Sequence, residues 1–314
     1  MIVFALILLY GLWASIFPYN KLLLSFSAPL FLTGSRMTVA GILLLVYVFI
    51  RKQSSFLIPR KKFIAISLFA AIGIYATNAL EAWGLQYLPA AKTCFIYSLS
   101  PFFTAILSYI HDREKITLKK FLGLLIGFLG FFPVLFMQSN GGIDCSRFRI
   151  FAIPELSIVG ATLCSVYGWI LLRRIVKDGS IVPVFANGMS MLIGGILGLI
   201  HSRIFESWNP IPIVTGKLSA FIQGIVGVIF VSNIICYNLY GYMLKHFTAT
   251  FISFAGLLSP IFSSIISWLV LGEAINPILL ISTLVIALGL WIIYKEELRL
   301  GYIRQKPVEK KNLI

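Results

Sequence analysis

The stretch LSPFFTAILSYIHDRE, residues 99–114, returns later in the chain as LSPIFSSIISWLVLGE, residues 258–273. Both copies carry a Leu-Ser-Pro within an apolar run and end on a glutamate. The surrounding segments 85–116 and 244–275 are identical at 11 of 32 aligned positions, at a constant offset of 159 residues. Apolar composition alone explains shared Leu, Phe and Ile residues, but not a shared Leu-Ser-Pro and a shared Glu. The chain therefore contains an internal repeat.

A second match supports the same division at a slightly different offset. MTVAGILLL at 37–45 aligns with MLIGGILGL at 191–199, which lies 154 residues later. The Tyr-Gly pair at 10–11 matches the Tyr-Gly pair at 167–168 more weakly. Together these matches predict a first five-helix repeat at 1–137, a linker at 138–149, a second five-helix repeat at 150–297 and a basic cytoplasmic tail at 298–314.

Composition indicates a membrane protein. The chain is 59% hydrophobic and 12% charged, with a mean hydropathy of +0.95, whereas soluble domains are about a quarter charged. A helix needs about 20 apolar residues to cross the hydrocarbon core, where backbone amides must pair internally. We therefore predict an all-α integral membrane protein with ten transmembrane helices, near 2–20, 28–50, 63–85, 90–110, 119–137, 150–172, 181–201, 218–242, 247–271 and 276–294.

Basic residues predict how these spans are oriented. Of the 26 Lys and Arg residues, 19 fall on one face of the predicted membrane and 6 on the other, and basic loops stay in the cytoplasm. Both termini are therefore expected in the cytoplasm of a multi-pass protein of the cell (inner) membrane. The net charge of +15 arises from short clusters in loops, so we expect no nucleic-acid partner. Because each repeat has an odd number of spans, the copies are expected to be inverted, and inverted repeats let one central site face either side in turn.

The motifs resemble those of the drug/metabolite transporter superfamily, in its EamA-like ten-helix branch. The resemblance rests on RMTVAGILLL at 36–45, GLQYLPAA at 84–91, the two Leu-Ser-Pro motifs with Glu114 and Glu273, and the glycines Gly123, Gly127 and Gly130. It covers nearly the whole chain, although Asp112-Arg113-Glu114 replaces the usual Gly-Glu, so that helix end is expected to be capped differently. It implies two five-helix bundles around a central cavity. We expect a monomer or a homodimer. Transport without an ATPase is also implied, and the chain has no G-x-x-x-x-G-K-[ST] phosphate loop.

Arg36 and Glu81 are charged residues inside predicted spans. Arg36 lies in the second span, and Glu81 lies near the outer end of the third. A charge at the membrane centre costs about 2.5–3.5 kcal/mol, so each of them needs a partner, a cavity or water. Three interpretations stay open: a structural ion pair between Arg36 and Glu81, contact of Glu81 with a cationic group of the substrate, or lipid-facing side chains that snorkel to the membrane surface.

Other polar and aromatic side chains follow helical spacing. Hydroxyl residues on one face of the fourth and ninth spans are typical of close helix packing and also of a cavity lining. Pro101 and Pro260 are expected to bend these two spans. The candidate substrate-binding residues are Trp13, Arg36, Asn78, Glu81, Tyr97, Ser100, Asn233, Tyr237 and Ser259.

The sequence offers no catalytic constellation. Its three histidines fall at predicted membrane boundaries, and no Ser/His/Asp grouping, metal-ligand spacing or paired catalytic carboxylates occur. We therefore expect no catalytic residue, no metal site and no cofactor. A membrane-embedded lipid-modifying transferase, the alternative from another class, needs acidic or His residues clustered at one membrane face. A channel needs rings of charge or a filter loop.

The candidate residues predict a zwitterionic small-molecule substrate. Arg36 suits a carboxylate, Glu81 suits an ammonium or sulfonium, and the rings suit a stacked or cationic group. An amino acid fits this set, and so does S-adenosylmethionine. Phe-, Ile- and Lys-rich composition is typical of AT-rich, host-dependent bacteria, and on these grounds the chain also resembles the S-adenosylmethionine/S-adenosylhomocysteine exchangers of intracellular bacteria. An amino-acid or drug/metabolite exporter of the same fold is the alternative.

Overall fold

The computed structural model describes residues 2–51, 58–88, 93, 96–113, 115–137, 153–177, 179–259, 262 and 277–301. Within them the regular structure is helical, apart from one isolated bridge between Ser27 and Ile213. The predicted all-α fold is thereby confirmed for the described residues. The helices are α1 (Ile2–Leu24), α2 (Pro29–Ile50), α3 (Arg60–Phe69), η1 (Ala70–Ala76), α4 (Thr77–Tyr87), α6 (Ser100–Asp112), α7 (Leu118–Met137), α8 (Ile153–Val176), α9 (Pro183–Phe205), α10 (Leu218–Val228), η3 (Ile229–Cys236), α11 (Tyr237–Met243), α12 (Ala249–Ala255), η4 (Gly256–Leu258) and α14 (Pro277–Arg299).

Several of these helices are long and apolar enough to cross a membrane. They are Pro29–Ile50, Arg60–Tyr87, Ile153–Val176, Pro183–Phe205 and Leu218–Met243, and each coincides with a predicted span. Helices α1, α7 and α14 also occupy predicted spans. The spans predicted at 90–110 and 247–271 are described only in part, by α6 and by α12 with η4.

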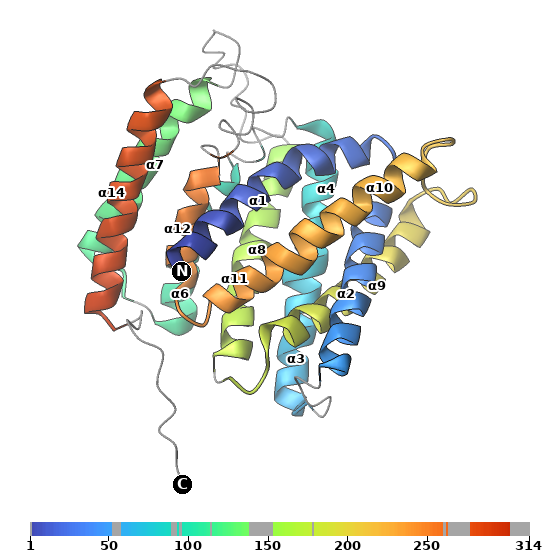
Figure 1. The fold of residues 1–314 in the computed structure, drawn as a ribbon, viewed down its shortest axis with the longest axis horizontal. Helices are drawn as coiled ribbons and strands as arrows, with labels where there is room; N and C mark the ends of the chain where they lie inside the picture. The colour runs from blue at the N-terminus through green and yellow to red at the C-terminus, as the bar shows by residue number, and fades with distance from the viewer. Residues whose placement is uncertain are drawn as a thin grey trace.

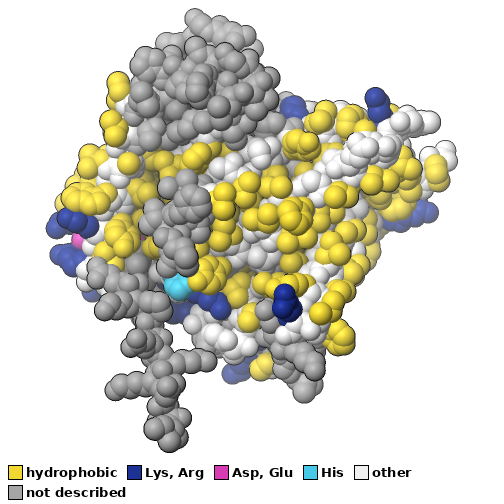
Figure 2. Space-filling model, in the orientation of Figure 1, with side chains coloured by type: hydrophobic (Ala, Val, Ile, Leu, Met, Phe, Trp, Pro, Cys, Tyr) yellow, Lys and Arg dark blue, Asp and Glu magenta, His cyan; other side chains and the backbone are white. Residues whose placement is uncertain are grey.

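The surface has the character of a lipid-facing one. Figure 2 shows a face covered mainly by hydrophobic side chains, with Lys and Arg toward its margins. Large apolar side chains such as Phe49 and Phe205 are 70% and 74% exposed, respectively. Apolar surface exposed to water is less stable than buried apolar surface by about 25 cal/mol per Å². In a membrane these side chains contact lipid instead, and this cost does not arise.

Helices α2 and α9 pack along their whole length and are antiparallel (Figure 1). Glycines make this approach possible: a Cβ atom at Gly41 would lie 2.5 Å from the backbone N of Leu192, and one at Gly195 would lie 2.4 Å from that of Thr38. The two contacts are reciprocal, because a shift of 154 residues turns Gly41 into Gly195 and Thr38 into Leu192. We call this glycine contact the α2–α9 seam.

Gly34 repeats the pattern at the other end of the seam. A Cβ atom at Gly34 would contact Leu199, and one at Gly188 would contact Leu45. The same shift of 154 residues relates Gly34 to Gly188 and Leu45 to Leu199. Small residues at matched positions let two membrane helices approach to backbone contact, as expected for association by close packing.

Two of the long helices contain a π-helical segment in the middle. The helix α3–η1–α4 is π-helical over Ala70–Ala76, and α10–η3–α11 is π-helical over Ile229–Cys236. The second segment begins 159 residues after the first, which is the offset of the Leu-Ser-Pro repeat. A π-helical turn holds an extra residue and changes the phase of the helix that follows, often at functional sites.

The region before each Leu-Ser-Pro is also irregular. A turn at residues 98–99 precedes α6, and Pro101 lies in the first turn of that helix. Pro101 thus begins a helix instead of bending one, since the first turn needs no N–H from proline. In the second half, α12 gives way to the 3₁₀ turn η4 just before Ser259; Pro260 lies outside the described residues.

Candidate functional site

A cavity of about 150 Å³ lies where both halves of the chain meet. Its walls come from α1, α2, α4, α6, α8, η3, α11, α12 and η4, and from the turn before α6. The lining residues are Tyr10, Trp13, Ile16, Asn20, Arg36, Thr77, Asn78, Glu81, Tyr97, Ser98, Ser100, Ser165, Val166, Trp169, Ser232, Tyr237, Tyr240, Ser253, Gly256, Leu257 and Ser259.

The structure brings almost all of the predicted site residues into this one cavity. The lining includes Trp13, Arg36, Asn78, Glu81, Tyr97, Ser100, Tyr237 and Ser259. Asn233 lies behind the wall, where its Nδ2 is 2.9 Å from Met37 Sδ. The sequence spacing of Asn233 and Tyr237 places them on one face only in an α-helix. In the π-helical segment η3 a spacing of five residues also returns to one face, and Ser232, five residues before Tyr237, lines the cavity instead.

Arg36 forms the centre of a polar cluster with Asn20 and Asn78. Its Nη1 donates to Asn20 Oδ1 at 3.0 Å, and its Nη2 donates to Asn78 Oδ1 at 2.6 Å. The side chain is only 4% exposed, and its Nε has no hydrogen-bond partner among the described residues. This guanidinium is therefore buried with neutral amides as its partners.

Glu81 is held separately from Arg36. Tyr97 donates its hydroxyl proton to Glu81 Oε2 at 2.7 Å. The described residues include the ion pairs Lys120–Glu297 and Arg299–Glu296, and neither lies at the cavity. The two charges of the cavity thus share one lining without forming a direct ion pair, and each keeps capacity for a ligand.

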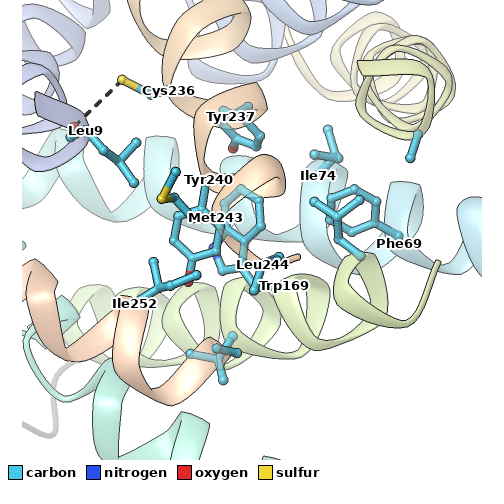
Figure 3. Packing of buried hydrophobic residues seen from close by; sticks show 14 of the residues in the cluster. Leu9, Phe69, Ile74, Trp169, Cys236, Tyr237, Tyr240, Met243, Leu244 and Ile252 are labelled. Carbon is cyan, nitrogen blue, oxygen red and sulfur yellow. Dashed lines mark hydrogen bonds between the residues drawn. The ribbon is translucent and has the colours of Figure 1, made fainter. Parts of the chain in front are cut away.

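Four rings form an aromatic cluster in the same lining: Trp13, Trp169, Tyr237 and Tyr240. Trp169 stacks on Tyr240, with ring centroids 4.0 Å apart and an interplanar angle of 25° (Figure 3). Trp13 contacts the other three rings with centroid distances of 5.6 to 5.9 Å. Asn78 Nδ2 lies 3.4 Å from the Tyr237 hydroxyl and links the two clusters.

Sequence reasoning missed several members of both clusters. Trp169 and Tyr240 carry no polar signal of the kind that singles out Asn or Glu inside a span. Their signal is positional, since Tyr240 lies one helical turn beyond Tyr237 and Trp169 follows the repeated Tyr-Gly pair. Asn20 falls at the end of the first predicted span, where an amide is ordinary.

The lining can bind a small molecule that carries both charges and an aromatic part. A guanidinium binds carboxylate, a carboxylate binds ammonium or sulfonium, and stacked rings bind planar or cationic groups. Among the described residues no group of three or more His, Cys, Asp or Glu side chains is arranged to hold a metal ion. The geometry is that of a ligand cavity with a few convergent polar groups.

Comparison with known proteins identifies relatives over most of the chain. The model of the EamA-like transporter family matches residues 1–136 and 152–295. A Chlamydia muridarum protein named S-adenosylmethionine/S-adenosylhomocysteine transporter is 41% identical over 305 residues, which are 96% of this chain and 94% of that protein. A Chlamydia trachomatis protein with the same name is 40% identical over 96% of this chain and 92% of its own length.

The fold also occurs in a solved structure. The crystal structure of another protein superposes on this chain with a TM-score of 0.73, over 95% of this chain and 97% of the other. Sequence identity between the two is 16%, so this likeness concerns the fold alone.

Proposed function

The chain belongs to the EamA-like transporter family, and from that membership we propose that it exchanges S-adenosylmethionine for S-adenosylhomocysteine across the inner cell membrane. It is a membrane transporter and not an enzyme, like the relatives named above. One observation supports the same substrate for this chain as for these relatives: Arg36 and Glu81 share a cavity lining with four aromatic rings.

Each part of S-adenosylmethionine has a counterpart in that lining. The molecule carries a carboxylate, an ammonium, a sulfonium and an adenine ring. Arg36 is the group for the carboxylate, and Glu81 is the group for the ammonium. The aromatic cluster receives the adenine by stacking and the sulfonium by cation–π attraction, which contributes about 0.5–2 kcal/mol. S-adenosylhomocysteine keeps every one of these groups except the sulfonium charge, so one cavity serves both partners of an exchange.

Alternating access is the mechanism that the architecture favours. We propose ten transmembrane helices in two inverted repeats, 1–137 and 150–297, with a linker at 138–149 and a tail at 298–314. The reciprocal contacts of the α2–α9 seam and the π-helical segments 159 residues apart support this two-fold arrangement. Helices interrupted next to a central site are typical of such carriers, and the turn before α6 borders the cavity.

The proposed arrangement of spans also gives the orientation of the protein in the membrane. An even number of spans and the 19 to 6 distribution of Lys and Arg place both termini in the cytoplasm. Cysteine labelling of a variant with a single cysteine at Ser54 in intact cells tests this. The residue lies in the loop expected inside, so it should stay unlabelled until the membrane is permeabilised.

Exchange measured with purified protein in liposomes tests the function. Vesicles loaded with S-adenosylhomocysteine should take up labelled S-adenosylmethionine, whereas empty vesicles should take up much less. Glu81→Gln should lower the rate about tenfold or more, because it removes the charge that pairs with the ammonium. Glu296→Gln, which changes a glutamate away from the cavity, is the matched control. Equal uptake by liposomes with and without protein would refute the proposal, and uptake of amino acids instead would favour the exporter alternative.

A further inference from the structure

The hydrogen-bond partners of Arg36 bear on which substrates the cavity accepts, which the family relationship does not specify. A buried guanidinium normally has a carboxylate as its counter-ion, because an isolated charge in a region without water is costly. Here both hydrogen-bonded partners are amide oxygens, from Asn20 and Asn78. Amides satisfy the N–H groups without neutralising the charge. Arg36 therefore has no direct ion-pair partner among the described residues, and its positive charge is not neutralised by one.

The amide of Asn78 is itself held in place, and the helix end that carries Asn20 is attached to α4. Asn78 donates from Nδ2 to the carbonyl oxygen of Ile74 at 2.7 Å, which leaves its Oδ1 facing Arg36. Asn20 is 7% exposed and sits beside Lys21, whose Nζ donates to the carbonyl oxygens of Leu85 and Leu88 at the end of α4. That contact attaches the end of α1 to α4, as basic side chains do at helix C-termini. We call the arrangement of Asn20, Arg36 and Asn78 the amide clamp.

The two amides do not use all the donors of the clamped guanidinium. Arg36 offers five N–H groups in a planar fork, and Nε is buried without a partner among the described residues. Arg36 lines the cavity and is almost fully buried. A carboxylate is the chemical group that both accepts from such a fork and supplies the missing negative charge.

We propose that the amide clamp makes the cavity selective for substrates with a free carboxylate, with Asn20 as a positioning residue that keeps Arg36 available. This inference rests on the proposed function and adds to it a selectivity rule. The substrate's own carboxylate is the counter-ion of Arg36. Analogues that share the adenine, sulfonium and amine of the substrate but lack the carboxylate leave the guanidinium uncompensated, so they bind more weakly.

The isosteric change Asn20→Asp tests the clamp directly. It replaces the amide by a resident carboxylate at the same position, which ion-pairs with Arg36 and competes with the substrate's carboxylate. The probes are S-adenosylmethionine and its decarboxylated form, each used to compete with labelled S-adenosylmethionine for exchange into liposomes. In the unaltered protein the decarboxylated form should compete about 10- to 100-fold less well, the range expected for charge-assisted hydrogen bonds.

In Asn20→Asp the two competitors should become equal within about threefold, because S-adenosylmethionine loses its advantage while the decarboxylated form loses nothing. A ratio is the readout because a merely structural defect lowers exchange of both molecules alike. Asn78→Asp makes the same change on the opposite side of the guanidinium and serves if Asn20→Asp does not reach the membrane. Asn238→Asp is the matched control, since Asn238 donates to the carbonyl of Ile234 outside the cavity lining, and it should keep the original ratio.

The outcomes separate this inference from the proposed function. Normal exchange of S-adenosylmethionine by the unaltered protein, with equal competition by the decarboxylated form, would overturn the clamp and leave the function intact. An unchanged ratio in Asn20→Asp and Asn78→Asp would do the same. No exchange of S-adenosylmethionine by the unaltered protein would overturn the function, and the clamp's selectivity rule with it.

Discussion

The helices α3–η1–α4 and α10–η3–α11 have the same backbone irregularity but differ in side-chain chemistry. Each has a π-helical segment, and these segments begin 159 residues apart. At the same offset, Asn78 of the first helix corresponds to Tyr237 of the second, and Glu81 corresponds to Tyr240. All four residues line the cavity. Matched backbones suit two halves that must exchange roles, whereas unmatched side chains suit a substrate with one charged end and one aromatic end.

The largest expected effect concerns the matched backbone. Gly41→Val and Gly195→Val each place a branched side chain against the backbone of the partner helix, where even a Cβ atom would lie 2.4–2.5 Å away. Overpacking of this kind should destabilise the protein by about 3 kcal/mol, and by similar amounts in both variants because their contacts are reciprocal. Thermal unfolding of detergent-purified protein measures it. Gly227→Val is the control, since nothing lies within 4 Å of a Cβ atom there. Strongly unequal losses at Gly41 and Gly195 would argue against the two-fold arrangement.

The next effect concerns the polar cluster. Asn78→Leu removes the acceptor for Arg36 Nη2 and the contact with Tyr237. An unsatisfied charged donor costs about 2 kcal/mol, so exchange of S-adenosylmethionine should fall about thirtyfold as measured by kcat/KM in liposomes. Asn238→Leu, on the helix that carries Tyr237 but outside the lining, is the control. Wild-type kcat/KM in Asn78→Leu would remove Asn78 from the site.

The extent to which sequence predicts this site differs between its two clusters. Hydropathy locates the long spans because about 20 consecutive apolar residues are a strong signal, and a charge or amide inside them is visible, as with Arg36, Asn78 and Glu81. The π-helical segments have no such signal, since AAIGIYA at 70–76 and IFVSNIIC at 229–236 read as ordinary apolar helix. The longer repeat of the second segment accounts for Ser232 in the lining, where α-helical spacing from Tyr237 predicts Asn233.

The pairing of charges was also beyond the sequence. Depth along two spans allows an ion pair between Arg36 and Glu81, but lateral position depends on helix packing that periodicity does not encode. Packing brings Asn20 of α1 to Arg36 and Tyr97 to Glu81. The aromatic cluster was found only in part because an aromatic residue in a span is more often core or lipid-facing than a ligand contact.

A smaller effect is expected in the aromatic cluster. Trp169→Leu removes the ring that stacks on Tyr240, and aromatic pairs contribute about 1 kcal/mol beyond their buried area. The KM for S-adenosylmethionine should therefore rise about fivefold with little change in kcat, since the ring binds the substrate in both orientations of the carrier. Trp291→Leu, at a tryptophan that is 52% exposed and outside the lining, should leave KM unchanged. A loss of kcat at constant KM would assign Trp169 to the conformational change instead.

The smallest effect tests the link between the clusters. Tyr237→Phe keeps the ring and deletes only the hydroxyl that lies 3.4 Å from Asn78 Nδ2. Such a long contact contributes about 0.5 kcal/mol, so exchange should fall no more than about twofold. A loss as large as that of Asn78→Leu would mean that the Tyr237 hydroxyl contacts the substrate itself.

A structure of the protein bound to S-adenosylhomocysteine is the most direct test of a cavity with one charged and one aromatic part. The ligand's carboxylate should accept hydrogen bonds from Arg36 within the amide clamp, its ammonium should face Glu81, and its adenine should lie against Trp169 and Tyr240. A ligand bound elsewhere, or one in this cavity with its carboxylate turned away from Arg36, would contradict this assignment.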